Sequence, residues 1–310
     1  MRIDIYNVNH GQCAVVTCPN GRRIMIDCGD RLENGRWWAP SMHFYGQSID
    51  LLALMNLDED HLSNFELLSR YVGVGQILSN PTIGAGELLQ LKKDGMQLGT
   101  RAVYRWMLNP FKRVAPALDL GGVQVRCYFN PFIPLVSSET NNLSLVLIIQ
   151  LGYFKIVFSG DLEASGWREL LDRSPQFAAD LAGTSIFVAS HHGRADGRCA
   201  ELFDFFTPEI VVFSDAARQF ESQDTDDWYR QRCLGAVVIA DPPQRRYVVT
   251  TRNDGDMRID VFPDGSWTWL PVKIQDWEIR PQLRPAVHEI NPFGALPGSS
   301  HLRRSDFNKP

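Results

Sequence analysis

The sequence predicts an α/β (α+β) fold in which two β-sheets pack together and helices cover them from outside. Apolar segments of strand type are interrupted by segments of helical spacing, in the order strands, helix, strands, helices. Polar clusters repeatedly follow the C-terminal ends of the expected strands, which indicates a site on the loops along one edge. No internal repeat at a solenoid period is present in the 310 residues.

Strands are expected where apolar residues alternate with polar ones or form short β-branched runs. In the first half of the chain they are residues 2–8, 13–18, 22–28, 51–55, 76–78 and 121–129. In the second half they are a hairpin over 143–163 and strands at 185–190, 210–214, 245–251 and 257–262. The tight turn of the hairpin is expected at Gly152 and Tyr153.

Helices are expected where apolar residues recur at helical spacing. They fall at residues 62–71, once or twice within 85–108, and near 163–181, 200–206 and 224–233. Residues 31–50 are expected to form a loop that carries Trp37, Trp38, His43, Phe44 and Tyr45. A lid or edge packing is the favoured role of these aromatic side chains, with a base-stacking platform as the alternative.

Composition limits the classes of protein. Hydrophobic residues make up 44% and charged residues 22%, which is typical of a soluble globule with a sizeable core. The net charge of −5 argues against a broad nucleic-acid coat but allows a local basic groove. Candidates for that groove are Lys92, Lys93, Arg101, Arg105, Lys112 and Arg113.

The location is expected to be cytoplasmic, without a membrane partner. No apolar run reaches the length of a membrane span, and the first residues do not resemble a signal peptide. The six cysteines are scattered and lack the CxxC spacing of a structural zinc site, so reduced thiols are expected.

Residues 1–270 are assigned to one domain and residues 271–310 to a Pro-rich C-terminal extension or partner-binding arm. This extension lacks apolar periodicity and is a candidate contact for a protein partner or for a second copy of the chain. Its expected anchors are Trp277, Ile279 and Phe293.

Four polar groups stand out because each follows an apolar strand. They are Asp27, the box at 56–61, Asp161 and the pair His191–His192. Aspartate and histidine at strand ends, far apart in sequence, are the residue types that a sheet-built metal site requires. Clustered carboxylates also repel one another unless a cation lies among them. A divalent metal site is therefore the favoured interpretation.

Structural explanations remain open for each residue taken alone. Asp58 and Asp60 are expected as helix caps before Leu62 in the alternative interpretation, and Asp161 as a cap of the following helix. His61 alone is more often a hydrogen-bonded core histidine than a ligand. The adjacent histidines could form a solvated turn.

The order of motifs resembles that of a metallo-β-lactamase-fold hydrolase, in the branch related to the ComEC competence-protein hydrolase domain. The motifs are "NVNHGQ" (7–12), "IDCG" (26–29), "NLDEDH" (56–61), "NNLSLVL" (141–147), "FSGD" (158–161) and "SHHG" (190–193). They run in order between residue 2 and about residue 215. The resemblance implies an αββα sandwich of two mixed sheets and a hydrolase domain over residues 1–270.

The resemblance also implies a set of metal ligands. Asp60, His61, Asp161 and His191 would form the second metal site, with Asp161 as the bridging carboxylate. Asp58 and, weakly, Asn56 would belong to the first site. Asp27 and Asn142 would lie behind the ligands, with Asp27 orienting a ligand histidine.

Asn56 stands where the family has a histidine, and an amide oxygen is a weaker ligand than an imidazole. The implied cofactor is one or two divalent ions, Mn²⁺ or Zn²⁺, with Mg²⁺ also suited to an oxygen-rich first site. That first site would fill weakly, or only when a substrate phosphate supplies oxygens.

The expected activity is that of a metal-dependent phosphodiesterase or nuclease, with nucleic acid as substrate and a metal-activated water as nucleophile. Asp60 would be catalytic, and His192 and His10 would donate the proton to the leaving oxygen. One alternative is a hydrolase of a small ester, lactone or cyclic nucleotide. The other is a degenerate, non-catalytic scaffold subunit.

Overall fold

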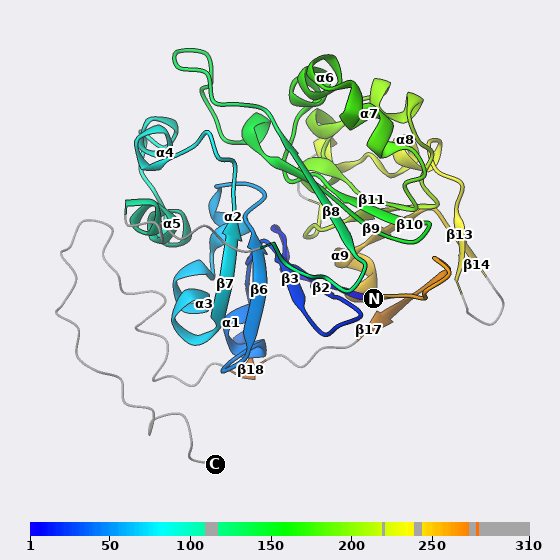
Figure 1. Cartoon of the computed structure of the whole chain (residues 1–310), viewed down its shortest axis with the longest axis horizontal. Coiled ribbons are helices and arrows are strands. Elements are labelled where there is room, and N and C mark those ends of the chain that lie inside the picture. The colour runs from blue at the N-terminus through cyan, green and yellow to red at the C-terminus, as the bar shows by residue number, and fades with distance from the viewer. Residues whose placement is uncertain (109–116, 219–220, 239–243, 273–276, 279–310) are drawn as a thin grey trace.

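Two mixed β-sheets form the middle of the fold (Figure 1). The protein is described here by a computed structural model, which covers residues 1–108, 117–218, 221–238, 244–272 and 277–278. The first sheet has the strand order β17 (Trp267–Val272), β16 (Asp256–Val261), β1 (Arg2–Ile5), β2 (Ala14–Thr17), β3 (Arg23–Ile26), β6 (Ser48–Ala53) and β7 (Gly73–Leu78). Its strands pair antiparallel from β17 to β3 and parallel from β3 to β7.

The second sheet is mainly parallel, whereas the first is mainly antiparallel. Its order is β15 (Val248–Thr250), β12 (Ile210–Phe213), β11 (Ile186–Val188), β10 (Phe154–Phe158), β9 (Leu145–Leu151) and β8 (Gln124–Phe129). The strands β15, β12, β11 and β10 run parallel, whereas β10–β9 and β9–β8 are antiparallel.

Helices cover the outer faces of both sheets (Figure 1). The first sheet is covered by α1 (Pro40–His43), α2 (Glu59–Leu62), α3 (Phe65–Tyr71), α4 (Ala85–Leu91) and α5 (Leu98–Leu108). The second is covered by α6 (Ala164–Arg173), α7 (Pro175–Leu181) and α8 (Asp226–Arg230). Helix α9 (Thr251–Asp254) connects β15 to β16. Short 3₁₀ turns are η1 (Asn141–Leu143), η2 (Ser190–Gly193), η3 (Ala195–Gly197), η4 (Glu201–Asp204) and η5 (Glu221–Gln223).

The main core lies between the two sheets. Alternate residues of each strand enter it, such as Ile3 of β1, Leu147 of β9 and Ile156 of β10. On β9 the intervening Val146 and Ile148 are also buried, beneath the helices of the second sheet. Burial on both faces explains why this strand reads as a continuous apolar run rather than an alternation.

The predicted fold class, two mixed sheets packed together with helices outside, is confirmed. The hairpin turn also falls at Gly152 and Tyr153. The loop expected over residues 31–50 is wrong in part, because a hairpin of β4 (Arg31–Glu33) and β5 (Arg36–Trp38) forms there. Its turn is Asn34–Gly35, where both residues have positive φ, the conformation that this dipeptide favours in two-residue turns.

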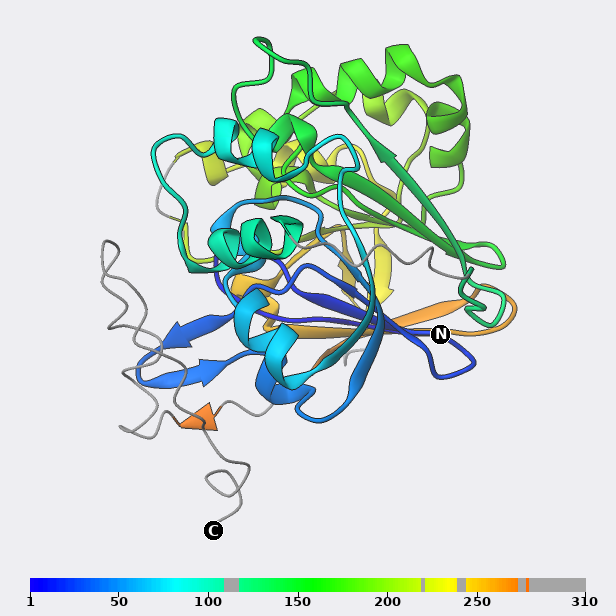
Figure 2. The same cartoon turned by 60° about the vertical axis from the view of Figure 1, so that its left-hand side comes forward.

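Of the aromatic side chains of this region, Trp37, Trp38 and Phe44 are buried, whereas Tyr45 is exposed. Trp38 is buried and stacks on Tyr6, with ring centroids 4.4 Å apart. Figure 2 shows the β4–β5 hairpin extending from the layered sheets, with β18 (Trp277–Glu278) beside it. Strand β17 continues past the expected domain boundary at residue 270, and β18 pairs with β5.

Other expected elements differ in detail. The helix near 200–206 is only the 3₁₀ turn η4, and the strand over 245–251 divides into β14 (Gln244–Arg246) and β15. Strand β13 (Ala236–Val238) pairs with β14 and was not expected. The proposed anchors Ile279 and Phe293 lie outside the described residues, so a separate extension and its partner stay predictions. Within the described ranges, every helix is too short or too polar to cross a bilayer.

Packing between the sheets predicts which residues of the β9–β10 hairpin carry stability. Ile156 is fully buried, so Ile156→Ala should lower the free energy of unfolding by about 2–5 kcal/mol. Tyr153, at the turn of the same hairpin, is 89% exposed, and Tyr153→Ala should change it by less than about 0.5 kcal/mol. Urea unfolding of both variants tests this, and equal effects would contradict the assigned core.

Candidate metal centre

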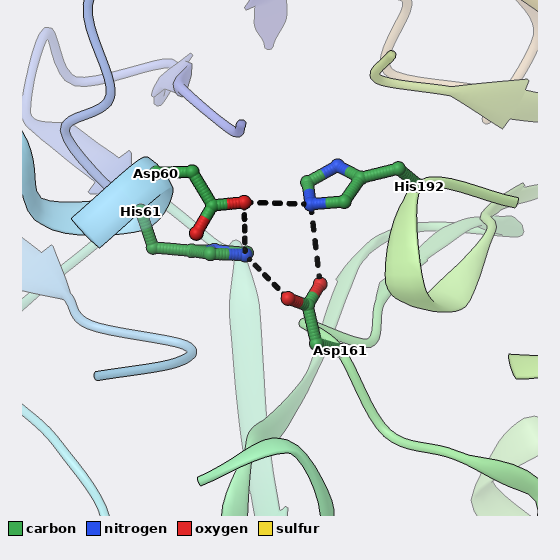
Figure 3. A group of neighbouring side chains, drawn as sticks. All are labelled: Asp60, His61, Asp161 and His192. Atoms are coloured by element: carbon green, nitrogen blue, oxygen red, sulfur yellow. Dashed lines mark hydrogen bonds and ion pairs between the residues drawn. The ribbon is translucent and has the colours of Figure 1, made fainter. Parts of the chain in front are cut away.

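Four side chains converge at one edge of the sheets (Figure 3). They are Asp60, His61, Asp161 and His192, called here the His–Asp cluster, and their ligand atoms all lie within 4.8 Å of one another. His192 Nε2 lies 3.1 Å from Asp60 Oδ2 and 3.5 Å from Asp161 Oδ1. His61 Nε2 lies 3.0 Å from Asp161 Oδ2 and 4.0 Å from Asp60 Oδ2.

Strand ends from both sheets bring these residues together. Asp60 and His61 belong to α2, which follows β6, whereas Asp161 follows β10 and His192 follows β11. Backbone hydrogen bonds fix the connection, since Cys28 N donates to His61 O at 2.8 Å. Across the sheets, Leu145 N donates to Met55 O at 2.8 Å. The site is therefore built on the rigid ends of strands.

Both histidines are oriented by a hydrogen bond on Nδ1. His61 Nδ1 donates to Asp27 Oδ2 at 2.6 Å, and Asp27 is fully buried. His192 Nδ1 donates to the carbonyl oxygen of Ser214 at 2.6 Å. Each ring therefore turns Nε2 toward the cluster, where this nitrogen would bind a metal ion once its proton is released, the arrangement usual for metal-ligating histidines. The structure places Asp27 in contact with a ligand-type histidine, as the sequence analysis expected.

The histidines and carboxylates of the cluster stabilise one another's charges. Burial alone would lower the pKa of His61, but Asp161, Asp27 and Asp60 raise it well above its ordinary value. Burial works against ionisation of Asp60, but the charge of His61 and the hydrogen bond from His192 lower its pKa to about 2. The same histidines hold the pKa of Asp161 far below its usual range, against burial.

The donor set fits a divalent ion. Two imidazole nitrogens and two carboxylates face one point, and such mixed donors suit Zn²⁺ or Mn²⁺. Asp161 Oδ1 is buried and has no hydrogen-bond partner among the described residues. A buried carboxylate oxygen without a partner is costly unless a cation completes its contacts.

The structure groups His192, and not the predicted ligand His191, with Asp60, His61 and Asp161. Both residues have left-handed backbone angles, with φ of 51° and 56°, so their side chains diverge from a tight turn. His191 Nδ1 instead lies 2.9 Å from Asp196 Oδ1, in a separate, more exposed group with Glu163. The ring of His192, predicted as a proton donor, faces Asp60 and Asp161.

The other acids of the 56–61 box have separate partners. Asp58 begins α2 but makes no capping hydrogen bond, and its Oδ1 accepts from Lys92 Nζ and Thr140 Oγ1. Glu59 accepts from the backbone N–H groups of Gly99 and Thr100, at 2.9 and 3.0 Å. Asp58, predicted as a first-site ligand, therefore lies outside the cluster and pairs with Lys92 instead.

Asn56 also differs from its expected role as a weak oxygen ligand. Its Oδ1 accepts from Leu57 N at 2.6 Å, and its Nδ2 donates to Asp161 Oδ2 at 3.1 Å. The amide therefore presents hydrogens to the cluster. Asn142 contacts no member of the cluster by a hydrogen bond among the described residues, and its Oδ1 instead accepts from the N–H groups of Glu163 and Gly166 at the start of α6.

His10 lies beside the cluster but is not suited to donate a proton. Its ring centroid is 4.4 Å from that of His192, and its Nε2 accepts from Arg194 Nη2 at 2.9 Å. Burial, followed by the nearby charge of His192, lowers the pKa of His10 to about 4. His10 is therefore neutral near pH 7 and acts as an acceptor. Arg194 was missed in the sequence, where nothing connects it to His10.

Fold and site together define a protein of two packed mixed β-sheets, consistent with the metallo-β-lactamase fold that the motif order resembles, with a buried His/Asp cluster able to hold a metal ion. The chain is a distant relative of ComE operon protein 3 of Bacillus subtilis (strain 168), with 24% identity over 229 residues. The match covers 68% of this chain and 28% of the relative, so the chain spans well under two thirds of that protein. No family model matches the chain.

Two solved structures of CmlA show a weaker similarity. One is CmlA, a diiron β-hydroxylase from Streptomyces venezuelae, with a TM-score of 0.44 and 15% identity. The other is a mutant of CmlA β-hydroxylase, with a TM-score of 0.45 and 14% identity. Each match covers 74% of this chain and 50% of the CmlA chain.

The cluster predicts that ion binding stabilises the fold. Mn²⁺ or Zn²⁺ at 100 times its dissociation constant should add about 2.7 kcal/mol to the free energy of unfolding, and EDTA should remove this gain. His192→Ala should abolish the increase in melting temperature because it removes a converging nitrogen. His191→Ala, at the neighbouring position, should retain it. The reverse result would restore His191 as the ligand.

The site is expected to require glycine at position 29, where the backbone passes close to Asp60. A Cβ there would lie 2.6 Å from the carbonyl oxygen of Asp60, so Gly29→Ala must displace the segment that carries Asp60 and His61. Affinity for Mn²⁺ should fall on the order of 10-fold, as when groups that orient ligands are lost. Gly86→Ala on α4 meets nothing within 4 Å and should leave affinity unchanged. Titration calorimetry of both variants measures this, and unchanged affinity in Gly29→Ala would contradict the requirement.

Proposed function

We propose that the protein is a metal-dependent phosphodiesterase that acts on nucleic acid. The observation that carries the proposal is the buried His–Asp cluster, whose Asp60 also lines a cavity of about 490 Å³ together with His10 and Lys92. A divalent ion in the cluster would supply Lewis acidity, lowering the pKa of a water and balancing the charge of phosphate oxygens. The motif order that resembles the competence-protein hydrolase domain supports the phosphodiester as substrate.

The chain's own residues have distinct parts in this proposal. His61 and His192 would hold the ion through Nε2, because their Nδ1 atoms already bond to Asp27 and to the Ser214 carbonyl. Asp60 is 28% exposed and ionised near neutral pH, so it can accept a hydrogen bond from a water on the cavity side. Arg194, bonded to His10, places a positive charge beside the cluster that suits a phosphate group.

A hydrolase of a small ester, lactone or cyclic nucleotide is the second candidate. The cavity has a size ordinary for small-ligand sites. The basic residues expected to form a nucleic-acid path are also partly engaged, since Lys92 pairs with Asp58 and Arg105 with Glu66. Lys112 and Arg113 lie outside the described residues. The intact donor set of the cluster favours either enzyme over the non-catalytic scaffold.

An activity assay tests the proposal. With Mn²⁺ the protein should cleave single- or double-stranded DNA, and Asp161→Ala should reduce the rate by more than about 100-fold, because even groups that only orient ligands are worth 10–100-fold. Asp172→Ala, an exposed aspartate on α6, is the matched control and should retain the rate.

Substrate and salt dependence separate the candidates. Cleavage of nucleic acid should weaken steeply as salt is raised, because phosphate contacts release counterions. Turnover of a small ester, lactone or cyclic nucleotide without cleavage of DNA would favour the second candidate. A bound ion without hydrolysis of any of these compounds would favour the scaffold.

A further inference from the structure

A lysine ammonium pairs with Asp58, the acid that the motif order assigns to a further metal site. Lys92, at the end of α4, donates from Nζ to Asp58 Oδ1, and Nζ lies 3.1 Å from Thr140 Oγ1. Thr140 Oγ1 also donates to Asp58 Oδ1. The side chains of Lys92 and Asp58 are only 22% and 29% exposed. Lys92 and Asp58 thus form a partly buried ion pair, and Thr140 is hydrogen-bonded to both partners. The pair lines the same cavity as Asp60.

Amide hydrogens face the cluster from the adjoining side. Asn56 Nδ2 donates to Asp161 Oδ2 and lies 3.2 Å from Asn141 Oδ1, to which it also donates. Its oxygen is fixed away from the cluster by the bond from Leu57 N. Asn141 Nδ2 in turn donates to Glu163 Oε1 at 3.2 Å. On this side Asp161 Oδ2 therefore accepts a hydrogen bond from an amide group and does not face a second cation.

A single divalent ion would match the two carboxylates of the cluster, Asp60 and Asp161, when both histidines are neutral ligands. Of the other acids that line the cavity, Asp58 is matched by Lys92. Asp30 and Glu59 instead accept hydrogen bonds from neutral groups, Asp30 from the Trp37 indole and the Ser63 hydroxyl and Glu59 from backbone N–H groups. A second divalent ion near Asp58 would have to displace the ammonium or lie beside it, and like charges at short range repel strongly where water is scarce.

We propose that this is a one-metal centre in which the Lys92 ammonium takes the place of a second divalent ion. The inference deepens the proposed function and rests on its assignment of the His–Asp cluster to metal binding, but not on the identity of the substrate. Lys92 is then a positioning residue that sets the charge and the ion count of the cavity.

Counting bound Mn²⁺ by equilibrium dialysis and elemental analysis tests the inference on the full chain. The wild type should bind one equivalent, and Lys92→Met should bind a second, weaker one at the freed Asp58. Lys93→Met removes the neighbouring exposed charge and should still bind one. The double variant Lys92→Met with Asp58→Asn should return to one equivalent.

The spectrum of the bound Mn²⁺ gives a second readout that needs no variant. One isolated ion gives the uncoupled electron paramagnetic resonance signal, whereas two ions about 3.5–4 Å apart would be exchange-coupled. Two equivalents or a coupled signal in the wild type would overturn the inference, as would a single equivalent in folded Lys92→Met. One bound ion without phosphodiester hydrolysis would count against the proposed function and leave this inference standing.

Discussion

A buried series of hydrogen bonds, Asp27–His61–Asp161, joins the end of a strand of one sheet to the end of a strand of the other. Burying charged groups is costly unless each is paired and fully hydrogen-bonded. Asp27 meets this condition through His61 and the Met55 N–H, at 2.6 Å each. The approach of the two sheets at this edge and the directions of His61 and Asp161 depend on keeping that series intact.

Two acids of the 56–61 box, Asp58 and Glu59, attach the neighbouring helices α4 and α5 to this segment. Asp58 holds Lys92 at the end of α4, and Glu59 holds the N–H groups of Gly99 and Thr100 at the start of α5. The segment between these helices, which includes Gly95 and Met96, lines the cavity. Both ends of this segment are therefore attached to Asp58 and Glu59, so that a displacement of this wall of the cavity would also displace Asp60.

The layered fold and the strand ends that carry the site followed from the sequence, because burial patterns repeat over several residues. The choice between His191 and His192 could not follow, because two successive left-handed residues reverse the ordinary direction of side chains. The pairing of Lys92 with Asp58 joins residues 34 positions apart, and no local pattern records it. By contrast, the Asn34–Gly35 turn carried a local signal that the aromatic residues around it obscured.

The central place of β1 has a consequence for the order of folding. Strand β1 pairs with β2 on one side and with β16 on the other, and the Met1 ammonium bonds to Val261 O across 260 positions of sequence. The loop after β1 brings Gly11 against the carbonyl of Asp60, and Ser214 Oγ bonds to Gly11 O at 2.7 Å. Contacts of such separation close late, because the loop entropy must first be overcome. The edge that carries the His–Asp cluster therefore gains its final support only after the segments around Gly11 and Ser214 have come together.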